Sequence, residues 1–322
     1  MNDHDNILLR MEDLHVDVGQ PPHRVHALRG VSLTMKPGQR LGIIGESGSG
    51  KTMAALSILR LLPPTATTLR GAIWYRSQNL LALPEERLRA VRGKEIGVVF
   101  QNALTALNPL FPVGRQIADV YRFHEGVAAD VAWDKAVATL DDMGIPDPQR
   151  RARAYPHQYS GGMAQRAMIA MALVCSPSLL IADEPTTGLD LTIQAQVLDL
   201  IHDHVVASGA ALLLISHDLA VIADMCTDVV VMYAGEVLET GPLREIFAAP
   251  KSPYTKALIE CFGVNVQDRR LAYIAGRVPD LRQEPVGCSF AARCPLADAI
   301  CRRERPLLRQ IGANHEVACH FA

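Results

Sequence analysis

A glycine-rich loop between a buried strand and a helix constrains this chain more than any other feature. Residues 45–52 read Gly-Glu-Ser-Gly-Ser-Gly-Lys-Thr and follow the apolar run 41–44. Backbone N–H groups can converge on phosphate oxygens only where side chains are absent, and the following helix directs its positive end at the same anion. In such a loop the lysine reaches the β- and γ-phosphates and the threonine hydroxyl binds Mg²⁺. The sequence therefore predicts an α/β core whose phosphate-binding residues are Gly45, Ser47, Gly48, Ser49, Gly50, Lys51 and Thr52.

A second apolar run ends in two carboxylates. Residues 179–182 are followed directly by Asp183 and Glu184. A buried parallel strand delivers its last residues to the edge of the sheet where α/β proteins bind their ligands. We expect Asp183 to hold the Mg²⁺ shell and Glu184 to polarise an attacking water molecule.

A second anion-binding segment precedes these carboxylates. Ser160, Gly161 and Gly162 open a helical stretch. A serine followed by two glycines at a helix N-terminus presents backbone N–H groups and the positive end of the helix dipole. One bound nucleotide does not need two such phosphate-binding segments, so the second one requires an explanation of its own.

Together these motifs resemble the nucleotide-binding subunits of ATP-binding-cassette (ABC) transporters, over roughly residues 8 to 250. They correspond, in the same order, to that family's Walker A loop, signature motif and Walker B strand. By the same resemblance, Gln101 is the Q-loop residue that contacts Mg²⁺ and water and senses the membrane subunits. Asp190 belongs to the D-loop, and His217 is the switch histidine on the γ-phosphate.

The resemblance implies a mechanism that needs two subunits. In that family the signature of one subunit closes on the γ-phosphate bound by the other, so we expect the chain to pair with a second, homologous ABC ATPase in a heterodimer. The expected cofactors are ATP and Mg²⁺, with the ion bound by Thr52, Gln101 and Asp183. The expected catalytic residues are Lys51, Gln101, Glu184 and His217.

Two stretches depart from the usual family pattern. Tyr159 and Met163 replace the ends of a signature usually written LSGGQ, while the Ser-Gly-Gly core is intact. Upstream of the Walker A loop, where many members place an aromatic ring on adenine, this chain offers only His23, Val25 and His26. His26 could stack on the base, and we expect weaker base affinity or selectivity.

The order of the patterns predicts an α/β fold of the ABC type: a P-loop core, an N-terminal antiparallel β subdomain, an inserted helical subdomain and a small C-terminal extension. Residues 7–44 are β-rich, the strand signal disappears after residue 101, and strands and helices alternate again over 169–232. We predict a nucleotide-binding domain over 1–250, with its helical subdomain at about 102–165, and an extension over 251–322.

Composition limits the partners and the location. The formal net charge is −2, so no basic surplus favours nucleic acid. Acidic residues stand where a signal peptide would be basic, and the apolar runs fall far below the roughly 20 residues of a spanning helix. We expect a protein bound peripherally to the cytoplasmic face of the inner membrane. The resemblance implies two transmembrane permease subunits and, indirectly, a periplasmic or extracellular substrate-binding protein.

Four of the seven cysteines fall near the C-terminus, at positions 288, 294, 301 and 319. Disulfides are not expected in a cytoplasmic chain. The segment resembles the C-terminal extension of peptide-type ABC ATPases, which implies a [4Fe-4S] cluster held by Cys288, Cys294, Cys301 and Cys319. Zinc on three cysteines with His315 or His320, or plain reduced thiols, are the alternatives. We expect the remaining thiols to be inert core residues: Cys175, Cys226 and Cys261.

The resemblance also implies a substrate class. Segments 100–102, 105–109 and 155–158 look like those of the dipeptide and oligopeptide group, and nickel and opine importers share much of them. We therefore predict an ATPase that energises a bacterial importer of di- or oligopeptides. A soluble ABC ATPase acting on DNA or ribosomes would be expected to carry tandem cassettes or a basic patch. A P-loop kinase would have no use for the second anion-binding segment.

Overall fold

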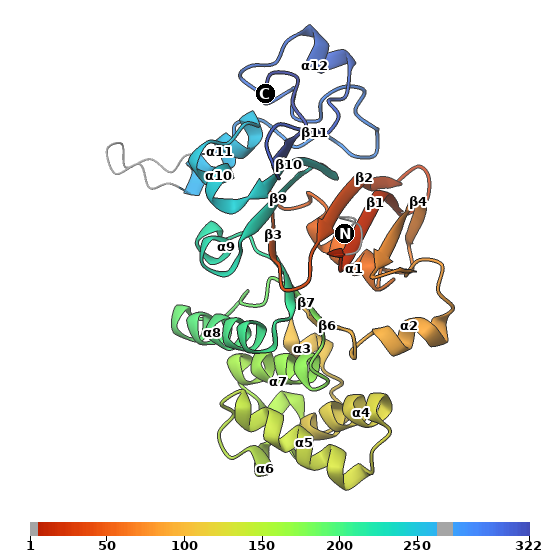
Figure 1. Cartoon of the computed structure of the whole chain (residues 1–322), viewed down its shortest axis with the longest axis vertical. Helices are drawn as coiled ribbons and strands as arrows, with labels where there is room; N and C mark the ends of the chain where they lie inside the picture. The colour runs from red at the N-terminus through yellow and green to blue at the C-terminus, as the bar shows by residue number, and fades with distance from the viewer. Residues whose placement is uncertain (1–5, 263–272) are drawn as a thin grey trace. The chain divides into compact units, whose positions relative to one another are not determined.

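The structure is a computed structural model that describes residues 6–262 and 273–322. The acidic N-terminal stretch noted above lies largely outside these ranges, as does part of the predicted extension. The chain divides into two compact units. The first comprises residues 1–36, 40–82 and 215–322, and the second comprises 37–39 and 83–214. Figure 1 labels elements of both where there is room.

The first unit begins with an antiparallel sheet of four strands in the order β2-β1-β4-β5. The strands are β1 (Leu9–Val18), β2 (Val25–Met35), β4 (Ala66–Tyr75) and β5 (Gln78–Asn79). Leu9 on β1 lies opposite Met35 on one side and Tyr75 on the other. Leu9, Met11 and Val16 are at most 1% exposed, so the apolar residues of β1 anchor this sheet to the core. The N-terminal β subdomain that the sequence predicts is therefore present.

Further strands of the first unit support the phosphate-binding loop. β3 (Arg40–Ile44) runs parallel to β9 (Asp228–Tyr233), and β9 pairs antiparallel with β10 (Glu236–Pro242). Helix α1 (Lys51–Ile58) follows the loop, and α9 (Leu219–Met225) precedes β9. Residues of β3 are almost fully buried, with Ile43 at 0% exposure. A strand that is apolar on both faces is typical of a parallel sheet covered on both sides.

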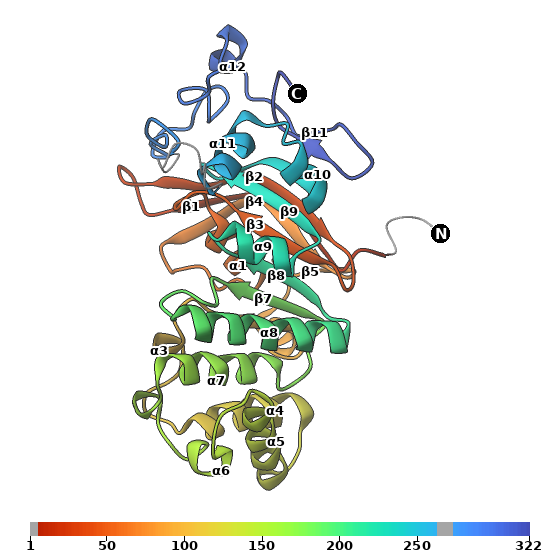
Figure 2. The same cartoon turned by 90° about the vertical axis from the view of Figure 1, so that its left-hand side faces the viewer.

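The second unit combines parallel strands with helices. β6 (Ile96–Val99) and β7 (Leu179–Asp183) are parallel, and β8 (Ala211–Ile215) lies next to β7. The helices are α2 (Glu85–Val91), α3 (Ala103–Ala106), α4 (Val113–Glu125), α5 (Ala129–Asp142), α6 (Pro148–Arg151), the 3₁₀ turn η2 (Pro156–Gln158), α7 (Gly161–Leu173) and α8 (Leu191–Ser208). In both views α7 lies beside α8 and α4 beside α5 (Figures 1 and 2). Within the described residues, no helix is long and apolar enough to cross a membrane.

The C-terminal part of the first unit adds short elements to the core. They are α10 (Leu243–Ala248), α11 (Pro253–Phe262), α12 (Ala299–Arg303), β11 (Arg309–Gln310) and β12 (Glu316–Val317). β12 pairs antiparallel with β10, with Val317 opposite Glu239. The carboxylate of Glu239 is fully buried and accepts hydrogen bonds from the backbone N–H groups of Lys251 and Ser252, at 2.8 and 2.9 Å. His315 Nε2 lies 2.8 Å from Glu239 Oε1.

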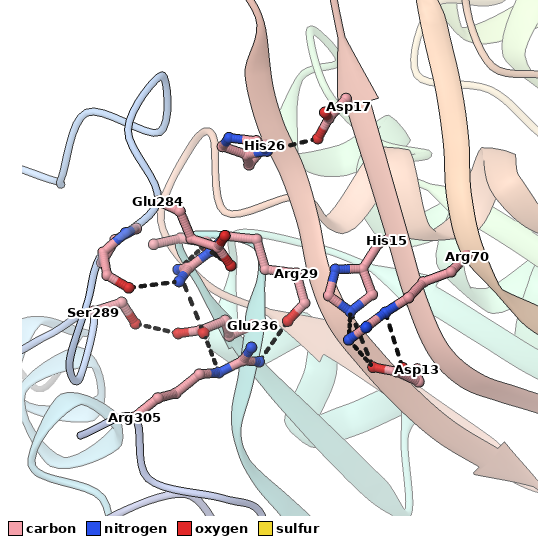
Figure 3. Close-up of polar contacts among 12 residues, drawn as sticks. Asp13, His15, Asp17, His26, Arg29, Arg70, Glu236, Glu284, Ser289 and Arg305 are labelled. Atoms are coloured by element: carbon pink, nitrogen blue, oxygen red, sulfur yellow. Dashed lines mark hydrogen bonds and ion pairs between the residues drawn. The ribbon is translucent and has the colours of Figure 1, made fainter.

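A buried ion-pair network also joins the extension to the strands (Figure 3). Arg29 on β2 is 1% exposed, and its Nη1 lies 3.4 Å from Glu236 Oε1. Arg305, from the extension, contacts the same carboxylate through Nε at 2.6 Å. Ser289 donates to Glu236 Oε2 at 2.5 Å. Since a buried carboxylate without partners is strongly destabilising, these contacts fix the extension to β10.

Candidate nucleotide site

The phosphate-binding loop leaves β3 and enters α1 in the first unit. Gly45 has φ +151°, and a Cβ there would lie 2.1 Å from the carbonyl oxygen of Met232. Gly50 has φ +100°, and its Cβ would lie 2.8 Å from the carbonyl oxygen of Ala27. Both positions therefore accept only glycine. The spacing of the glycines in the sequence follows from these close backbone contacts as well as from phosphate access.

Lys51 folds back into this loop. Its ammonium group donates to the carbonyl oxygens of Gly45 at 2.8 Å and of Glu46 at 3.1 Å, and the residue is 7% exposed. The backbone N–H of Ser49 donates to the same Glu46 oxygen at 3.2 Å. Thr52, one residue later, is exposed. The loop thus holds a cation at the N-terminus of a helix, which is the electrostatic setting of a phosphate site.

The carboxylates lie at the C-terminal edge of β7 in the second unit. Asp183 is the last residue of the strand and is 5% exposed. Glu184 has φ +46°, a left-handed conformation that is strained for a residue with a side chain. Its Oε2 accepts hydrogen bonds from Gln101 Nε2 and from Thr187 Oγ1, both at 2.9 Å. The structure therefore brings together Gln101 and Glu184, which lie 83 residues apart in the sequence.

The parallel pairing of β6 and β7 explains this contact. Val99 lies opposite Ala182 in the register of the two strands. Gln101 follows β6 by two residues and Glu184 follows β7 by one, so both reach the same edge of the sheet. Because Gln101 donates through its amide nitrogen, its carbonyl oxygen remains the group suited to a metal ion.

The signature residues form the first turn of α7. Ser160 is the N-cap, and its hydroxyl accepts from the backbone N–H of Met163 at 3.3 Å. Gly161 and Gly162 are the first two helical residues. Tyr159, one of the two departures from the family pattern, donates from its hydroxyl to the carbonyl oxygen of Arg151 at 2.8 Å. Burial raises the pKa of Tyr159 to about 12, so this hydroxyl keeps its proton and ties the segment before α7 to α6.

The D-loop and switch residues occupy other helix starts. Asp190 caps α8, accepting from the backbone N–H of Ile193 at 3.1 Å. His217 is exposed and lies between Ser216 and Asp218 at the start of α9. Asp218 caps α9, while the Ser216 hydroxyl accepts from the Asp218 backbone N–H at 3.0 Å. These local bonds fix the turn that presents His217.

The predicted site residues are divided between the two units. The phosphate-binding loop and His217 belong to the first, whereas Gln101, Asp183, Glu184, Ser160–Gly162 and Asp190 belong to the second. His26, the expected base-stacking residue, lies in the first unit with its Nδ1 2.7 Å from the buried carboxylate of Asp17 (Figure 3). That contact orients the imidazole ring.

The prediction of a [4Fe-4S] cluster is wrong. Within residues 6–262 and 273–322, no group of three or more His, Cys, Asp or Glu side chains is arranged to hold a metal ion. In the metal-free protein, burial raises the pKa of Cys288 to about 11 and also raises that of Cys294, so both thiols are protonated there. The same finding excludes the zinc alternative for Cys288, Cys294, Cys301 and Cys319.

The two histidines of the zinc alternative have other partners. His315 lies against Glu239, as described above, and His320 Nε2 lies 2.9 Å from the carbonyl oxygen of Glu304. All seven cysteines are free thiols. Buried Cys226 has its pKa raised to about 12 by desolvation, as expected for an inert core thiol. Hydrogen bonds and strand pairing join the described part of the extension to β10.

Comparison with known proteins agrees with these motifs. The chain matches the ABC transporter family over residues 28–187 and the oligopeptide/dipeptide transporter C-terminal region over 238–301. It is 49% identical to the probable peptide ABC transporter ATP-binding protein y4tR of Sinorhizobium fredii, covering 98% of this chain and 95% of that protein. It is 41% identical to the dipeptide transport ATP-binding protein DppD of Escherichia coli, covering 98% and 96%.

Solved structures give the same fold. A dimeric ATP-binding cassette in a post-hydrolysis state with ADP and phosphate matches with a TM-score of 0.66 and 26% identity, over 73% of this chain and 99% of that one. CbiO1 of Clostridium perfringens, part of the ABC transporter complex cbiONQ, matches with a TM-score of 0.62 and 25% identity, over 76% and 92%. The chain belongs to the ATP-binding subunits of ABC transporters, in the group that carries the oligopeptide/dipeptide C-terminal region. The predictions of fold class, family and ATPase activity are confirmed.

Proposed function

We propose that this ATPase energises the import of di- or oligopeptides through a membrane complex. The observation that carries the proposal is the match to both the ATPase domain and the peptide-type C-terminal region in one chain. Relatives that cover nearly the whole chain are named as peptide or dipeptide transport proteins. ATP is the energy source in this proposal.

In this proposal the phosphates of ATP bind at the loop of residues 45–52. Lys51, already enclosed by backbone carbonyls, would exchange those partners for the β- and γ-phosphates. Thr52, Gln101 and Asp183 would hold Mg²⁺, because they supply the hydroxyl, amide and carboxylate oxygens that this hard cation prefers. When bound, the ion neutralises phosphate charge.

Glu184 is the proposed base for the attacking water. Two donors, Gln101 and Thr187, hold its carboxylate in one orientation. Fixing a base before the reaction lowers the entropic part of the barrier. The strained backbone at Glu184 supports a functional reading, since such conformations persist where the surrounding structure requires them.

The remaining roles need a second subunit. Ser160, Gly161 and Gly162 present the start of α7 to the γ-phosphate bound by a homologous ATPase, and His217 stabilises the γ-phosphate of this chain's own ATP. Asp190 belongs to the D-loop at the same dimer interface. The dimeric form of a related cassette supports this arrangement. At the cytoplasmic face of the membrane, closure of the ATPase dimer on ATP and its opening after hydrolysis would move two transmembrane permease subunits. A substrate-binding protein would deliver the peptide to these permeases.

The test is reconstitution of the chain with its second ATPase and the two permeases in liposomes. Peptide-loaded binding protein should stimulate ATP hydrolysis and drive labelled peptide into the lumen. Stimulation by nickel- or opine-loaded binding protein, with none by peptide, would transfer the assignment to those importers. Hydrolysis that responds to neither permeases nor binding protein would contradict a transport role.

A further inference from the structure

The C-terminal extension contacts the phosphate-binding loop directly. Arg293 pairs with the loop residue Glu46 through two parallel bonds, Nη1 to Oε2 at 2.5 Å and Nη2 to Oε1 at 3.0 Å. The backbone N–H of Glu46 donates to the hydroxyl of Tyr254 at 2.9 Å. Both Arg293 and Tyr254 come from the part of the first unit that follows residue 250. A bidentate arginine–carboxylate pair fixes geometry as well as supplying attraction.

Arg293 is held rigidly on its own side. Its side chain is only 3% exposed, and it donates to the carbonyl oxygens of Ile274 at 2.8 Å and Ala275 at 3.0 Å. Its guanidinium lies 5.7 Å from the ring centroid of Tyr233 and 5.9 Å from that of Phe290. Hydrogen bonding to Glu46 raises the pKa of Arg293. The Arg293 guanidinium is therefore held by contacts from both the extension and Tyr233 of β9, whose hydroxyl accepts a hydrogen bond from Nη1 at 3.2 Å.

Tyr254 belongs to the same packed cluster of aromatic rings. Its ring centroid lies 4.6 Å from that of Tyr233 and 5.2 Å from that of Phe290. Tyr254 is fully buried, and burial raises the pKa of its hydroxyl. Tyr233 is the last residue of β9, while Phe290 lies in the extension. The two side chains that touch Glu46 are thus built into one cluster with the core.

Glu46 connects Arg293 and Tyr254 to Lys51. Its carbonyl oxygen accepts from the Lys51 ammonium group and from the Ser49 backbone N–H. The side chain, the N–H and the carbonyl of Glu46 are therefore all bonded at once. Any rotation of the Glu46 peptide planes would move the atoms that shape the loop around Lys51.

We propose that the C-terminal extension is a positioning element of the nucleotide site, in which Arg293 and Tyr254 hold Glu46 and so keep the phosphate-binding loop in its ATP-binding shape. The inference rests on the proposed binding of ATP phosphates at this loop. A plain docking contact between extension and core is the competing explanation. Glu46 retains 28% side-chain exposure, so water can solvate its carboxylate when Arg293 is removed. Removing Arg293 should therefore lower nucleotide affinity if the extension positions the loop, and should lower only stability if the pair is a docking contact.

The experiment is a double-mutant cycle on the full-length chain, using a fluorescent ATP analogue with Mg²⁺. Arg293→Met replaces a buried side chain by an apolar one of similar length, and Glu46→Gln removes the carboxylate charge. Each single change should weaken binding about tenfold, and the double change should weaken it no further, since both remove one interaction. Arg293→Lys, which keeps the charge and one hydrogen bond, should recover part of the affinity.

The matched control is Arg282→Met. Arg282 pairs with Asp280 at 2.5 Å in the same extension, and both side chains are more than half exposed. The Arg282→Met substitution should leave nucleotide binding unchanged. In the assembled transporter, Arg293→Met should raise the KM for ATP about tenfold with kcat unchanged, because Arg293 acts through Glu46, which is not one of the proposed catalytic residues.

Two results would overturn the inference. Nucleotide affinity within about twofold of wild type for Arg293→Met, together with a lower melting temperature, would make the pair a docking contact alone. If Arg293→Met does not fold, Glu46→Gln takes its place: a nucleotide affinity equal to that of wild type in Glu46→Gln would likewise make the pair a docking contact alone. Lys51→Ala in the same titration tests the proposed phosphate site separately from the positioning role of the extension. If Lys51→Ala loses ATP binding while Arg293→Met and Glu46→Gln keep it, only this inference is refuted. If Lys51→Ala binds ATP as tightly as wild type, the proposed phosphate site itself is refuted.

Discussion

Gln101 donates a 2.9 Å hydrogen bond from its amide nitrogen to the Glu184 carboxylate. The bond links the residue that follows β6 to the residue that follows β7. In the proposed function Gln101 senses the membrane subunits and Glu184 activates water, so this hydrogen bond would connect the two roles directly. Displacement of Gln101 by a permease would release one of the two donors that orient Glu184.

Glu184→Gln should retain ATP binding and lose most turnover, by about 10² or more, because it removes the carboxylate base while keeping the shape. An amide oxygen at position 184 can still accept from Gln101. Steady-state hydrolysis is the measurement, in a complex whose partner site is also disabled. Thr187→Val removes only the other donor and should have a smaller effect. Hydrolysis at the wild-type rate in Glu184→Gln would mean that the base lies elsewhere.

Lys51→Ala should act at an earlier step, on nucleotide affinity. A hydrogen bond to a charged group contributes about 2 kcal/mol, so the dissociation constant should rise about 30-fold or more. Equilibrium titration with Mg-ATP measures this directly. Lys94→Ala is a suitable control, since Lys94 pairs with Glu125 in the second unit. Binding as tight as that of wild type would show that Lys51 does not contact phosphate.

Ser160→Ala should separate helix stability from catalysis. Loss of the N-cap of α7 should cost about 1 kcal/mol of stability. The isolated chain should still bind ATP, whereas hydrolysis in the assembled dimer should fall, because Ser160 is proposed to contact the nucleotide bound by the partner subunit. Asp298→Ala removes the N-cap of α12, where Asp298 accepts from Ala299 at 2.6 Å. It should destabilise without lowering turnover, and equal turnover losses in both variants would argue against a signature role for Ser160.

His204 on α8 should make the protein less stable in mild acid. Burial lowers the pKa of His204, with Lys135 lowering it further and Asp142 opposing the shift. His204 therefore binds a proton more readily in the unfolded chain than in the folded one. Above about pH 6.5 the imidazole is neutral in both states and the folded protein keeps its full stability, and as the pH falls below that value protonation favours the unfolded chain. His204→Gln should reduce the drop in melting temperature between about pH 7.5 and pH 5.5. An unchanged drop would show that other groups dominate the acid sensitivity.

The phosphate-binding loop could be predicted because its glycines, lysine and threonine lie together in one short segment, residues 45–52. Gly45 and Gly50 are required by their own backbone angles, and Ser160 caps the helix that it begins. The Arg293–Glu46 pair could not be predicted, because it joins residues 247 positions apart. Cysteine spacing does not show whether thiols will be ionised, and burial at Cys288 favours the protonated form.

The pairing of β12 with β10 has a consequence for any shortened version of this protein. A chain cut before Glu316 would leave the outer backbone groups of β10 without the partner that β12 provides. Unpaired strand edges recruit strands from other molecules and promote aggregation. Removing the extension would therefore leave β10 with an unpaired edge that promotes aggregation. Poor solubility of such a fragment would reflect the loss of β12, independently of any effect on nucleotide binding.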